Sequence, residues 1–379
     1  MKQARIYLDN AATSFPKPQS VYARIDEILR VISGNPGRAS HRMALEASRV
    51  IFRAREAAAR LINAPDSARI AFTKNTTEAI NIGLKGLLKP QDHIVTTSFE
   101  HNSVVKTLSH LETLGVTVTK VRPDAFGVIN PAAVDKAVTA KTKAVCMTHA
   151  SNVFGAIEPV AEVGAICRKR GVIFMVDGAQ TLGALPVDVE AMHIDVLAAA
   201  GHKSLFGPQG TGFIYVRQGL ELPPIIHGGT GEIDTVLEMP ERLECGTMNT
   251  PGVGGLGAGI EFILNQGVKE IRRHEESIIR QLLEGLAPVK GVNILGPATA
   301  GERVSLVSFN INGIAPAEVG RRLDEDYGVM VRTGAHCAPE AHREALTYPD
   351  GAVRVSPGYF STPAEIDEFL RAIRETAKG

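Results

Sequence analysis

Short apolar runs alternate along this chain with longer stretches in which apolar residues recur at helical spacing. The short runs are predicted strands, and the longer stretches are predicted helices. A strand, a helix and a second strand in succession form a βαβ unit, which places its strands parallel in one sheet. The predicted strands are residues 69–73, 93–97, 143–148, 172–176, 194–199 and 213–216, and the predicted helices are residues 78–88, 103–114 and 160–170.

The run from Val172 to Val176 contains no polar residue, so both faces of this strand should be buried. Strands buried on both faces belong to sheets that helices cover on both sides. We therefore expect an α/β fold, in which a large domain holds a mostly parallel sheet flanked by helices.

The pattern changes near Thr250, where glycines crowd residues 251–259. The elements predicted after this point are a long helix at 258–286, strands at 304–309 and 353–355, and an amphipathic helix at 363–376. Thr362 is the expected N-cap of the last helix. This region predicts a smaller α+β C-terminal domain. We place the large domain at residues 17–260 and the small domain at residues 1–16 and 261–379.

One glycine pattern, from Gly252 to Gly257, matches the G-x-G-x-x-G signature of dinucleotide-binding sites. It follows Asn249-Thr250-Pro251 rather than a strand, so the context that such a site needs is missing. We interpret these glycines as a tight turn with close helix packing.

Charge balance and the lack of long apolar segments limit the partners that fit this chain. Lys and Arg number 41 and Asp and Glu number 41 among 379 residues, which argues against nucleic acid or an anionic membrane as a partner. No apolar stretch is long enough to span a bilayer, and Asp9 interrupts the N-terminus before a signal-peptide core develops. The four cysteines form no C-x-x-C pair. We expect a cytoplasmic protein without a disulfide framework or a metal site.

Two charged residues follow predicted strands at the sheet edge where ligands of open α/β folds bind. Asp177 ends a buried strand, and an acid there needs a cationic partner, such as a protonated heteroaromatic nitrogen, to stay ionised. Lys203 follows the strand that ends at Ala199, where partial desolvation would lower its pKa and favour Schiff-base formation. The alternatives are an N-cap role for Asp177 and a surface position in a glycine loop for Lys203.

Two further segments carry candidate chemistry. Asn75 to Glu78 lies between a strand and a helix, where two hydroxyls and free N–H groups can bind phosphate or, alternatively, only cap the helix. Cys337 stands beside His336 and close to Arg332, and nearby positive charge favours a nucleophilic thiolate. The alternative is a buried, inert cysteine, which is our interpretation of Cys146 and Cys167.

Taken together, these segments resemble one family over nearly the whole chain. The chain resembles the cysteine desulfurases of the class V aminotransferase superfamily, in the group II or SUF-like branch. The segments that carry the resemblance are Asp9 to Thr13, Asn75 to Glu78, Glu100 to Asn102, Asp177 to Gln180, Gly201 to Lys203 and Arg332 to Cys337. The resemblance implies the pyridoxal-phosphate fold type I, with a seven-stranded sheet in the large domain.

The resemblance also implies pyridoxal 5'-phosphate as the cofactor. Lys203 would bind it covalently, Asp177 would pair with its pyridine nitrogen, and His101 would stack on its ring. The other implied cofactor contacts are Gln180 and Asn152 at the phenolic oxygen, and Thr76, Thr77, His202 and a partner subunit's threonine at the phosphate. In this chain that threonine would be Thr247, which implies a homodimer. Arg354 would bind the substrate carboxylate, with Asn10, His41 and Asn152 also near the substrate.

The implied reaction converts L-cysteine to L-alanine. Lys203 would move the α-proton, and the Cys337 thiolate would attack the substrate sulfur. The persulfide left on Cys337 would pass to a sulfur-acceptor protein, in keeping with iron–sulfur cluster assembly.

Two positions depart from the family pattern. Ala200 stands where a Ser or Thr usually donates to the cofactor phosphate, a loss of about 1 kcal/mol. Ala335 stands where group II members commonly have a second histidine. The segment from Cys337 to Arg354 is short, as in group II.

Other functions on the same scaffold stay open at this point. Selenocysteine lyase, cysteine sulfoxide lyase and a plain class V aminotransferase are alternatives, and selenocysteine is a second candidate substrate. A catalytically silent binding protein is disfavoured by the intact set of Lys203, Asp177, His101 and Arg354.

Overall fold

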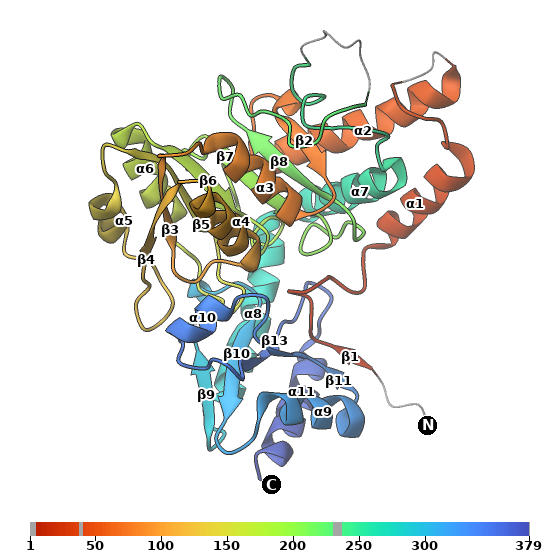
Figure 1. Cartoon of the computed structure of the whole chain (residues 1–379). Helices are drawn as coiled ribbons and strands as arrows, with labels where there is room; N and C mark the ends of the chain where they lie inside the picture. Colours follow the sequence, from red (N-terminus) through yellow and green to blue (C-terminus); the bar gives the residue numbers. More distant parts are fainter. Residues whose placement is uncertain (1–4, 38–40, 230–236, 379) are drawn as a thin grey trace.

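The computed structural model describes residues 5–37, 41–229 and 237–378. A seven-stranded sheet with its helices forms the upper part of the molecule in Figure 1, and a four-stranded sheet forms the lower part together with both chain ends. No helix among the described residues is long and apolar enough to cross a membrane.

The large sheet has the strand order β2-β8-β7-β6-β5-β3-β4. Every neighbouring pair from β7 to β4 is parallel, whereas β8 runs antiparallel to both β2 and β7. The strands are β2 (Ile70–Thr73), β3 (His93–Thr97), β4 (Thr117–Val121), β5 (Thr142–Thr148), β6 (Ile173–Asp177), β7 (Val196–Ala200) and β8 (Gly212–Val216). The expected α/β fold with a mostly parallel seven-stranded sheet is confirmed, and β4 is a strand that the sequence analysis did not predict.

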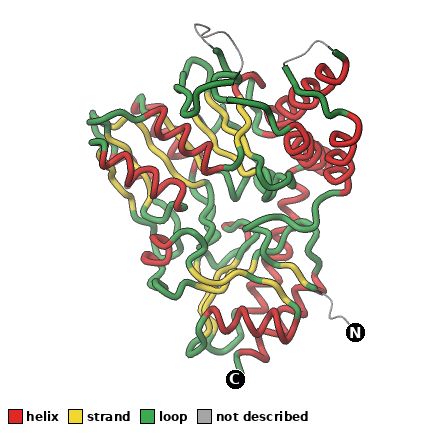
Figure 2. The backbone as a smooth tube through the Cα atoms, turned by 45° about the vertical axis from the view of Figure 1, so that its right-hand side comes forward, coloured by secondary structure: helices red, strands yellow, loops and turns green. Residues whose placement is uncertain are grey.

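Helices cover both faces of this sheet (Figure 2). Because successive strand residues point to opposite faces, Val145 and Met147 of β5 join one core cluster while Ala144 and Cys146 join the other. On the first face lie α2 (Arg42–Leu61), α6 (Val160–Arg170) and α7 (Thr250–Gln266), and on the second lie α3 (Thr76–Leu87) and α4 (Asn102–Thr113). A short helix, α5 (Pro131–Ala137), packs beside α6.

The glycine-rich segment after Thr250 lies inside α7, so the predicted tight turn is wrong and the predicted close helix packing is confirmed. A Cβ at Gly254 would come within 2.2 Å of the Cδ1 atom of Ile28 in α1 (Gln19–Val31), and one at Gly257 within 2.8 Å of the Ala54 Cβ. The absent side chains therefore let α7 pack directly on α1 and α2.

The single long helix predicted at 258–286 is wrong, because the chain forms two helices there. Gly267 separates α7 from α8 (Val268–Leu286) and has a φ of 85°, in the left-handed region that favours glycine. The amphipathic pattern continues across this break, which is why periodicity alone could not show it.

The smaller sheet is antiparallel with the order β12-β13-β10-β9. The strand predicted at 353–355 lies in β13 (Ala352–Val355), but the one predicted at 304–309 begins only at Val307 in β10 (Val307–Ile311). The residues before it bond to the large domain instead, since the Val304 N–H donates to the Gly155 carbonyl. The other two strands are β9 (Val292–Leu295) and β12 (Arg332–Gly334).

The N-terminal segment packs with the C-terminal region. Strand β1 (Ile6–Tyr7) pairs in parallel with β11 (Val329–Met330), and its Ile6 joins the core formed by α8, α9 (Pro316–Tyr327) and α11 (Pro363–Thr376). Thr362 caps α11 in a capping box with Glu365, as predicted. The division at residues 16/17 and 260/261 stays a prediction, although Ile6 and the C-terminal helices share one core.

Candidate functional site

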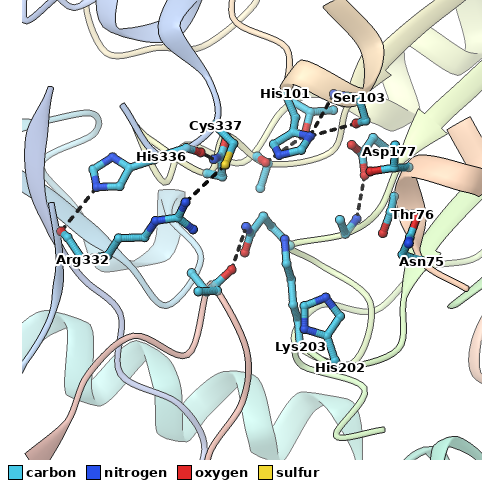
Figure 3. Close-up of a pocket in the computed structure, with 18 of the residues that line it drawn as sticks. Asn75, Thr76, His101, Ser103, Asp177, His202, Lys203, Arg332, His336 and Cys337 are labelled. Atoms are coloured by element: carbon cyan, nitrogen blue, oxygen red, sulfur yellow. Dashed lines mark hydrogen bonds between the residues drawn. The ribbon is translucent and has the colours of Figure 1, made fainter. Parts of the chain in front are cut away.

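A cleft of about 200 Å³ opens where the parallel strands of the large sheet end at their carboxyl side (Figure 3). Side chains from the loops after β6 and β7, the N-termini of α3 and α4, and the C-terminal region line it. Ten of the predicted site residues meet there: Thr76, Thr77, His101, Asn152, Asp177, Gln180, His202, Lys203, Cys337 and Arg354.

Three predicted site residues lie outside this cleft. Asn10 lines a small neighbouring cavity, where its amide donates to the Ser356 carbonyl and accepts from the Phe15 N–H. His41 is exposed and caps α2 through its Nδ1. Thr247 is exposed in the segment before α7. The roles assigned to these residues stay predictions.

One end of the cleft lies at the N-terminus of α3. The Asn75 side chain caps this helix by accepting a hydrogen bond from the Glu78 N–H. The backbone N–H groups of Thr76 and Thr77 have no partner among the described residues. The His202 Nδ1 is also buried and unpartnered, and burial lowers the pKa of its ring to about 4. Helix N–H groups, two hydroxyls and a neutral imidazole suit a phosphate group.

Asp177 occupies the end of β6 and is buried. Its Oδ1 accepts from the Ala179 N–H at 3.0 Å. Burial raises the pKa of this carboxyl, while the Ala179 N–H and the Lys203 ammonium act in the opposite direction. A cation bound next to Asp177 would keep it ionised, so this position can recognise a protonated ring nitrogen.

Lys203 follows β7 in a turn, and its side chain points into the middle of the cleft (Figure 3). Its Nζ forms no hydrogen bond with the described residues. Burial lowers the pKa of this amine to about 8; the Asp177 carboxylate opposes the change, and the guanidinium groups of Arg354 and Arg332 add to it. A share of the amine is therefore neutral and nucleophilic near neutral pH, as the sequence analysis predicted.

His101 lies across the cleft from Lys203 and is the N-cap of α4. Its Nδ1 accepts from the Ser103 N–H at 3.1 Å and lies 2.8 Å from the Ser103 hydroxyl. Burial lowers the pKa of His101 to about 4, and the charges of Lys203 and Arg332 add to this. A neutral ring whose Nδ1 accepts the Ser103 N–H carries its proton on Nε2.

Arg354 is fully buried in β13 and faces the same cleft. Its Nη2 donates to Asp9 Oδ1 at 3.0 Å and its Nη1 donates to the Asn152 carbonyl at 3.2 Å, while its Nε has no partner. The unpaired Nε–H and the remaining N–H groups can bind a carboxylate.

The Gln180 amide, on another wall, donates to the Ala11 carbonyl at 3.3 Å.

Cys337 is exposed at the mouth of the cleft, in a turn where both it and His336 have positive φ values of 60° and 50°. The Arg332 Nη2 donates to the Cys337 Sγ at 3.2 Å. The His336 ring does not supply the positive charge expected beside the thiol, because it faces the Arg332 carbonyl and His342, and burial lowers its pKa to about 2. Arg332 supplies the positive charge in direct contact with the sulfur.

Sequence reasoning missed several contributors to this site. Asp9 accepts a hydrogen bond from Arg354, and the Ser103 N–H donates to His101. His342 contacts His336. Only the Asp9 segment carried a sequence signal, through the family resemblance.

The other two assigned cysteines behave as predicted. Both are buried, and burial raises the pKa of Cys167 to about 12 and the pKa of Cys146 well above its usual range. Neither is therefore a nucleophile, and Cys337 is the cysteine that lines the cleft among the described residues.

Known proteins resemble this chain in sequence and in architecture. The family model of the class-V aminotransferases matches residues 6–369. A probable cysteine desulfurase of Methanothermobacter thermautotrophicus is 37% identical, over 98% of this chain and 94% of the relative. A cysteine desulfurase of Serratia proteamaculans is 33% identical, over 99% of this chain and 94% of the relative. The apo structure of a cysteine desulfurase from Thermococcus onnurineus superimposes with a TM-score of 0.94 at 35% identity, covering 99% of this chain and 95% of that one.

Proposed function

The chain belongs to the class-V aminotransferase family, and we propose that it is a pyridoxal-phosphate-dependent cysteine desulfurase that forms a persulfide on Cys337. The observation that carries this proposal is the position of Cys337. Its Sγ contacts the Arg332 guanidinium and lines the same cleft as the amine of the half-buried Lys203 and the buried carboxylate of Asp177. The relatives compared above carry the names cysteine desulfurase or probable cysteine desulfurase, which favours this function over selenocysteine lyase or transaminase.

The residues of the cleft fit pyridoxal 5'-phosphate. The unpartnered N–H groups of Thr76 and Thr77 and the orphaned Nδ1 of His202 suit its phosphate, and Asp177 suits its pyridine nitrogen. Lys203 would bind it covalently, with the neutral His101 ring on its face and Gln180 and Asn152 near its phenolic oxygen. The bound cofactor supplies an electron sink that stabilises negative charge on the substrate α-carbon.

The chain's own residues bind the substrate and move its proton. The Arg354 guanidinium binds the cysteine carboxylate through its free N–H groups. Because this guanidinium is already fixed by Asp9 and Asn152, it orients the substrate without first being ordered itself. The neutral share of Lys203 accepts the α-proton at Nζ and can return it to the alanine product.

Cys337 then receives the sulfur. Its thiolate forms an S–S bond to the substrate sulfur as the substrate Cβ–S bond breaks, and a proton on Cβ completes alanine. The products are alanine and a Cys337 persulfide, so atoms and electrons balance without an external oxidant. Because Cys337 is exposed, an acceptor protein can reach the persulfide, in line with a role in iron–sulfur cluster assembly.

A homodimer is also part of this proposal. Thr247 lies on the surface rather than in the cleft of its own subunit, which is consistent with a contact to the partner's phosphate group. Ala200 supplies no hydroxyl to the phosphate site, so a threonine from the partner would compensate for a missing donor.

The decisive experiment compares the holoenzyme with its Cys337→Ala variant. Wild-type protein given L-cysteine should form alanine, and mass spectrometry should find one additional sulfur on the peptide that holds Cys337. The variant should retain the cofactor, because Lys203 and Asp177 are unchanged, but alanine formation should fall by orders of magnitude.

The Cys167→Ala variant is the matched control, since its thiol is buried and protonated. It should form alanine at the wild-type rate. Alanine formation at the wild-type rate by Cys337→Ala would show that this cysteine is not the sulfur nucleophile and would favour a lyase or transaminase.

A further inference from the structure

A row of side-chain contacts runs behind the Cys337 turn. The Thr347 Oγ1 lies 2.8 Å from the His342 Nδ1, and the His342 Nε2 lies 3.3 Å from the His336 Nδ1. The His336 Nε2 in turn lies 3.4 Å from the Arg332 carbonyl. His342 is completely buried in α10 (Pro339–Glu344), the helix that follows Cys337.

Only one arrangement of protons satisfies this row with both rings neutral. The Arg332 carbonyl can only accept, so the His336 Nε2 must carry the proton and donate. The His336 Nδ1 is then an acceptor, which requires the His342 Nε2 to donate to it. The His342 Nδ1 therefore accepts from the Thr347 hydroxyl. Neutral rings agree with the burial of both histidines, which lowers the pKa of His336 to about 2 and that of His342 to about 4.

These contacts hold a turn that is conformationally unfavourable. His336 and Cys337 both have positive φ values, which residues with a Cβ rarely adopt. On the cleft side, Asn152 Nδ2 donates to the His336 carbonyl at 2.7 Å and the Asn102 N–H donates to the Cys337 carbonyl at 2.9 Å. On the opposite side, His342 holds the His336 ring. The turn is therefore fixed from both sides.

We propose that His342 is a positioning residue for Cys337, which acts through His336 and keeps the Cys337 Sγ in contact with the Arg332 guanidinium. The same row reaches the Arg332 backbone, so both members of the sulfur–guanidinium contact depend on it. The catalytic consequence rests on the proposed desulfurase function, whereas the effect on the position of the thiol does not.

The test compares His342→Leu with His342→Gln. Leucine removes both nitrogens, whereas the glutamine amide can still donate to the His336 Nδ1. The matched control is His93→Leu, because His93 is also buried and contacts two threonine hydroxyls, both at 2.8 Å, but lies at the opposite end of β3 from the cleft. Two quantities are measured for each holoenzyme: the rate at which iodoacetamide alkylates Cys337, followed by mass spectrometry, and the kcat and KM for L-cysteine.

His342→Leu should slow the alkylation of Cys337 and lower kcat by about tenfold or more, because a sulfur displaced from the guanidinium is less reactive. The KM should not change, because Arg354 and Lys203 are untouched. His342→Gln should recover most of both rates. His93→Leu should lower the thermal stability but leave both rates at the wild-type level.

Wild-type rates in His342→Leu, an equal loss in His93→Leu, or no recovery in His342→Gln would each overturn the proposal. If the leucine variant does not fold, Thr347→Val decides the question, because it removes the donor at the outer end of the row. Slower alkylation and a lower kcat are then expected, and wild-type values for both would contradict the proposal. A wild-type enzyme that makes no alanine would refute the desulfurase function alone, because alkylation still reports on the thiol.

Discussion

At the scale of single residues, burial rather than unusual chemistry prepares this site. The cleft holds Lys203 with a pKa lowered to about 8, His101 with a pKa lowered to about 4, and Asp177 with a raised pKa. In each case desolvation of the charged form is the largest cause. The consequence is an amine and an imidazole that can act as neutral groups near neutral pH, in a cleft that also contains a carboxyl in need of a cation.

The lowered pKa of Lys203 predicts that this residue lowers the free energy of unfolding of the cofactor-free protein by an amount that depends on pH. The folded state binds this proton less tightly than the unfolded state, so the cost is fully present below pH 8 and disappears as the pH rises towards 10.5. The lowering corresponds to about 3 kcal/mol. Lys203→Met should therefore unfold with a free energy higher than the wild type by up to about 3 kcal/mol at pH 7, and this difference should shrink towards pH 10.

Denaturant unfolding of both cofactor-free proteins at several pH values measures this difference. Lys106→Met is the control, because Lys106 is exposed on α4. Its stability difference from the wild type should not change with pH, which separates the effect from a general response to losing a lysine. A stability difference between Lys203→Met and wild type that is constant from pH 7 to pH 10 would contradict the prediction.

At the scale of elements, α7 supports the loop that follows Lys203. A Cβ on Gly259 would lie 2.3 Å from the Leu205 carbonyl oxygen and 3.1 Å from the Phe206 carbonyl carbon. On the other side of the helix, Gly254 and Gly257 allow close contact with α1 and α2. The glycines of α7 therefore set the distance between this helix and the backbone that carries the reactive lysine.

A methyl group at Gly259 should consequently disturb the site as well as the core. Gly259→Ala should lower the free energy of unfolding by about 1–3 kcal/mol, because the backbone of Leu205 and Phe206 must move. We also expect weaker retention of the cofactor, measured by absorbance after gel filtration.

Gly301→Ala is the matched control, because its added Cβ would meet only the Glu276 Oε1 at 3.7 Å, an ordinary contact. It should leave both stability and cofactor retention close to wild type. If Gly259→Ala unfolds and retains cofactor like the wild type, α7 does not set the position of the lysine loop.

At the scale of the whole molecule, one flank carries large apolar side chains without cover. They belong to α1 and α2, on the side of the large domain away from α5 and α6 (Figure 1). The exposed residues are Tyr22, Leu29, Val31, Met43, Leu45 and Phe52. Both helices pack on α7. Exposed apolar residues of this kind are typical of a surface that another protein chain covers, and the proposed homodimer supplies that chain.

Charge on this flank should therefore disrupt the dimer. Phe52→Asp should shift the protein towards monomers in analytical ultracentrifugation, because an unpaired carboxylate would be buried at the interface. Phe126→Asp is the matched control, since Phe52 and Phe126 are both 55% exposed but Phe126 lies in the segment between β4 and α5. It should leave the assembly unchanged.

The cofactor provides a second measure of the same assembly. If Thr247 contacts the partner's phosphate group, Thr247→Ala should remain dimeric but lose cofactor more readily, and Phe52→Asp should lose it together with the dimer. Monomers of Phe52→Asp that stay fully loaded with cofactor would contradict a shared site.

Local sequence signals were enough to predict the features that depend on nearby residues. Periodicity located the parallel strands other than β4 and the helices α3, α4, α6 and α11, but it did not predict α1, α2, α5, α9 or α10. The Thr362 cap marked the start of α11, and Lys203 and Asp177 were assigned to strand ends where they do lie. Such signals act within a few residues of one another, so they survive without knowledge of the chain path.

Tertiary structure alone decided which distant residues meet and which way their side chains face. Asp9 holds Arg354 across 345 positions, and Asn152 binds the His336 carbonyl across 184. The sequence placed His336 next to Cys337, yet the left-handed turn directs its ring towards His342 and leaves Arg332 at the sulfur. The physical reason is that adjacency along the chain fixes only the backbone connection, whereas packing against other elements decides each side chain's direction, burial and charge.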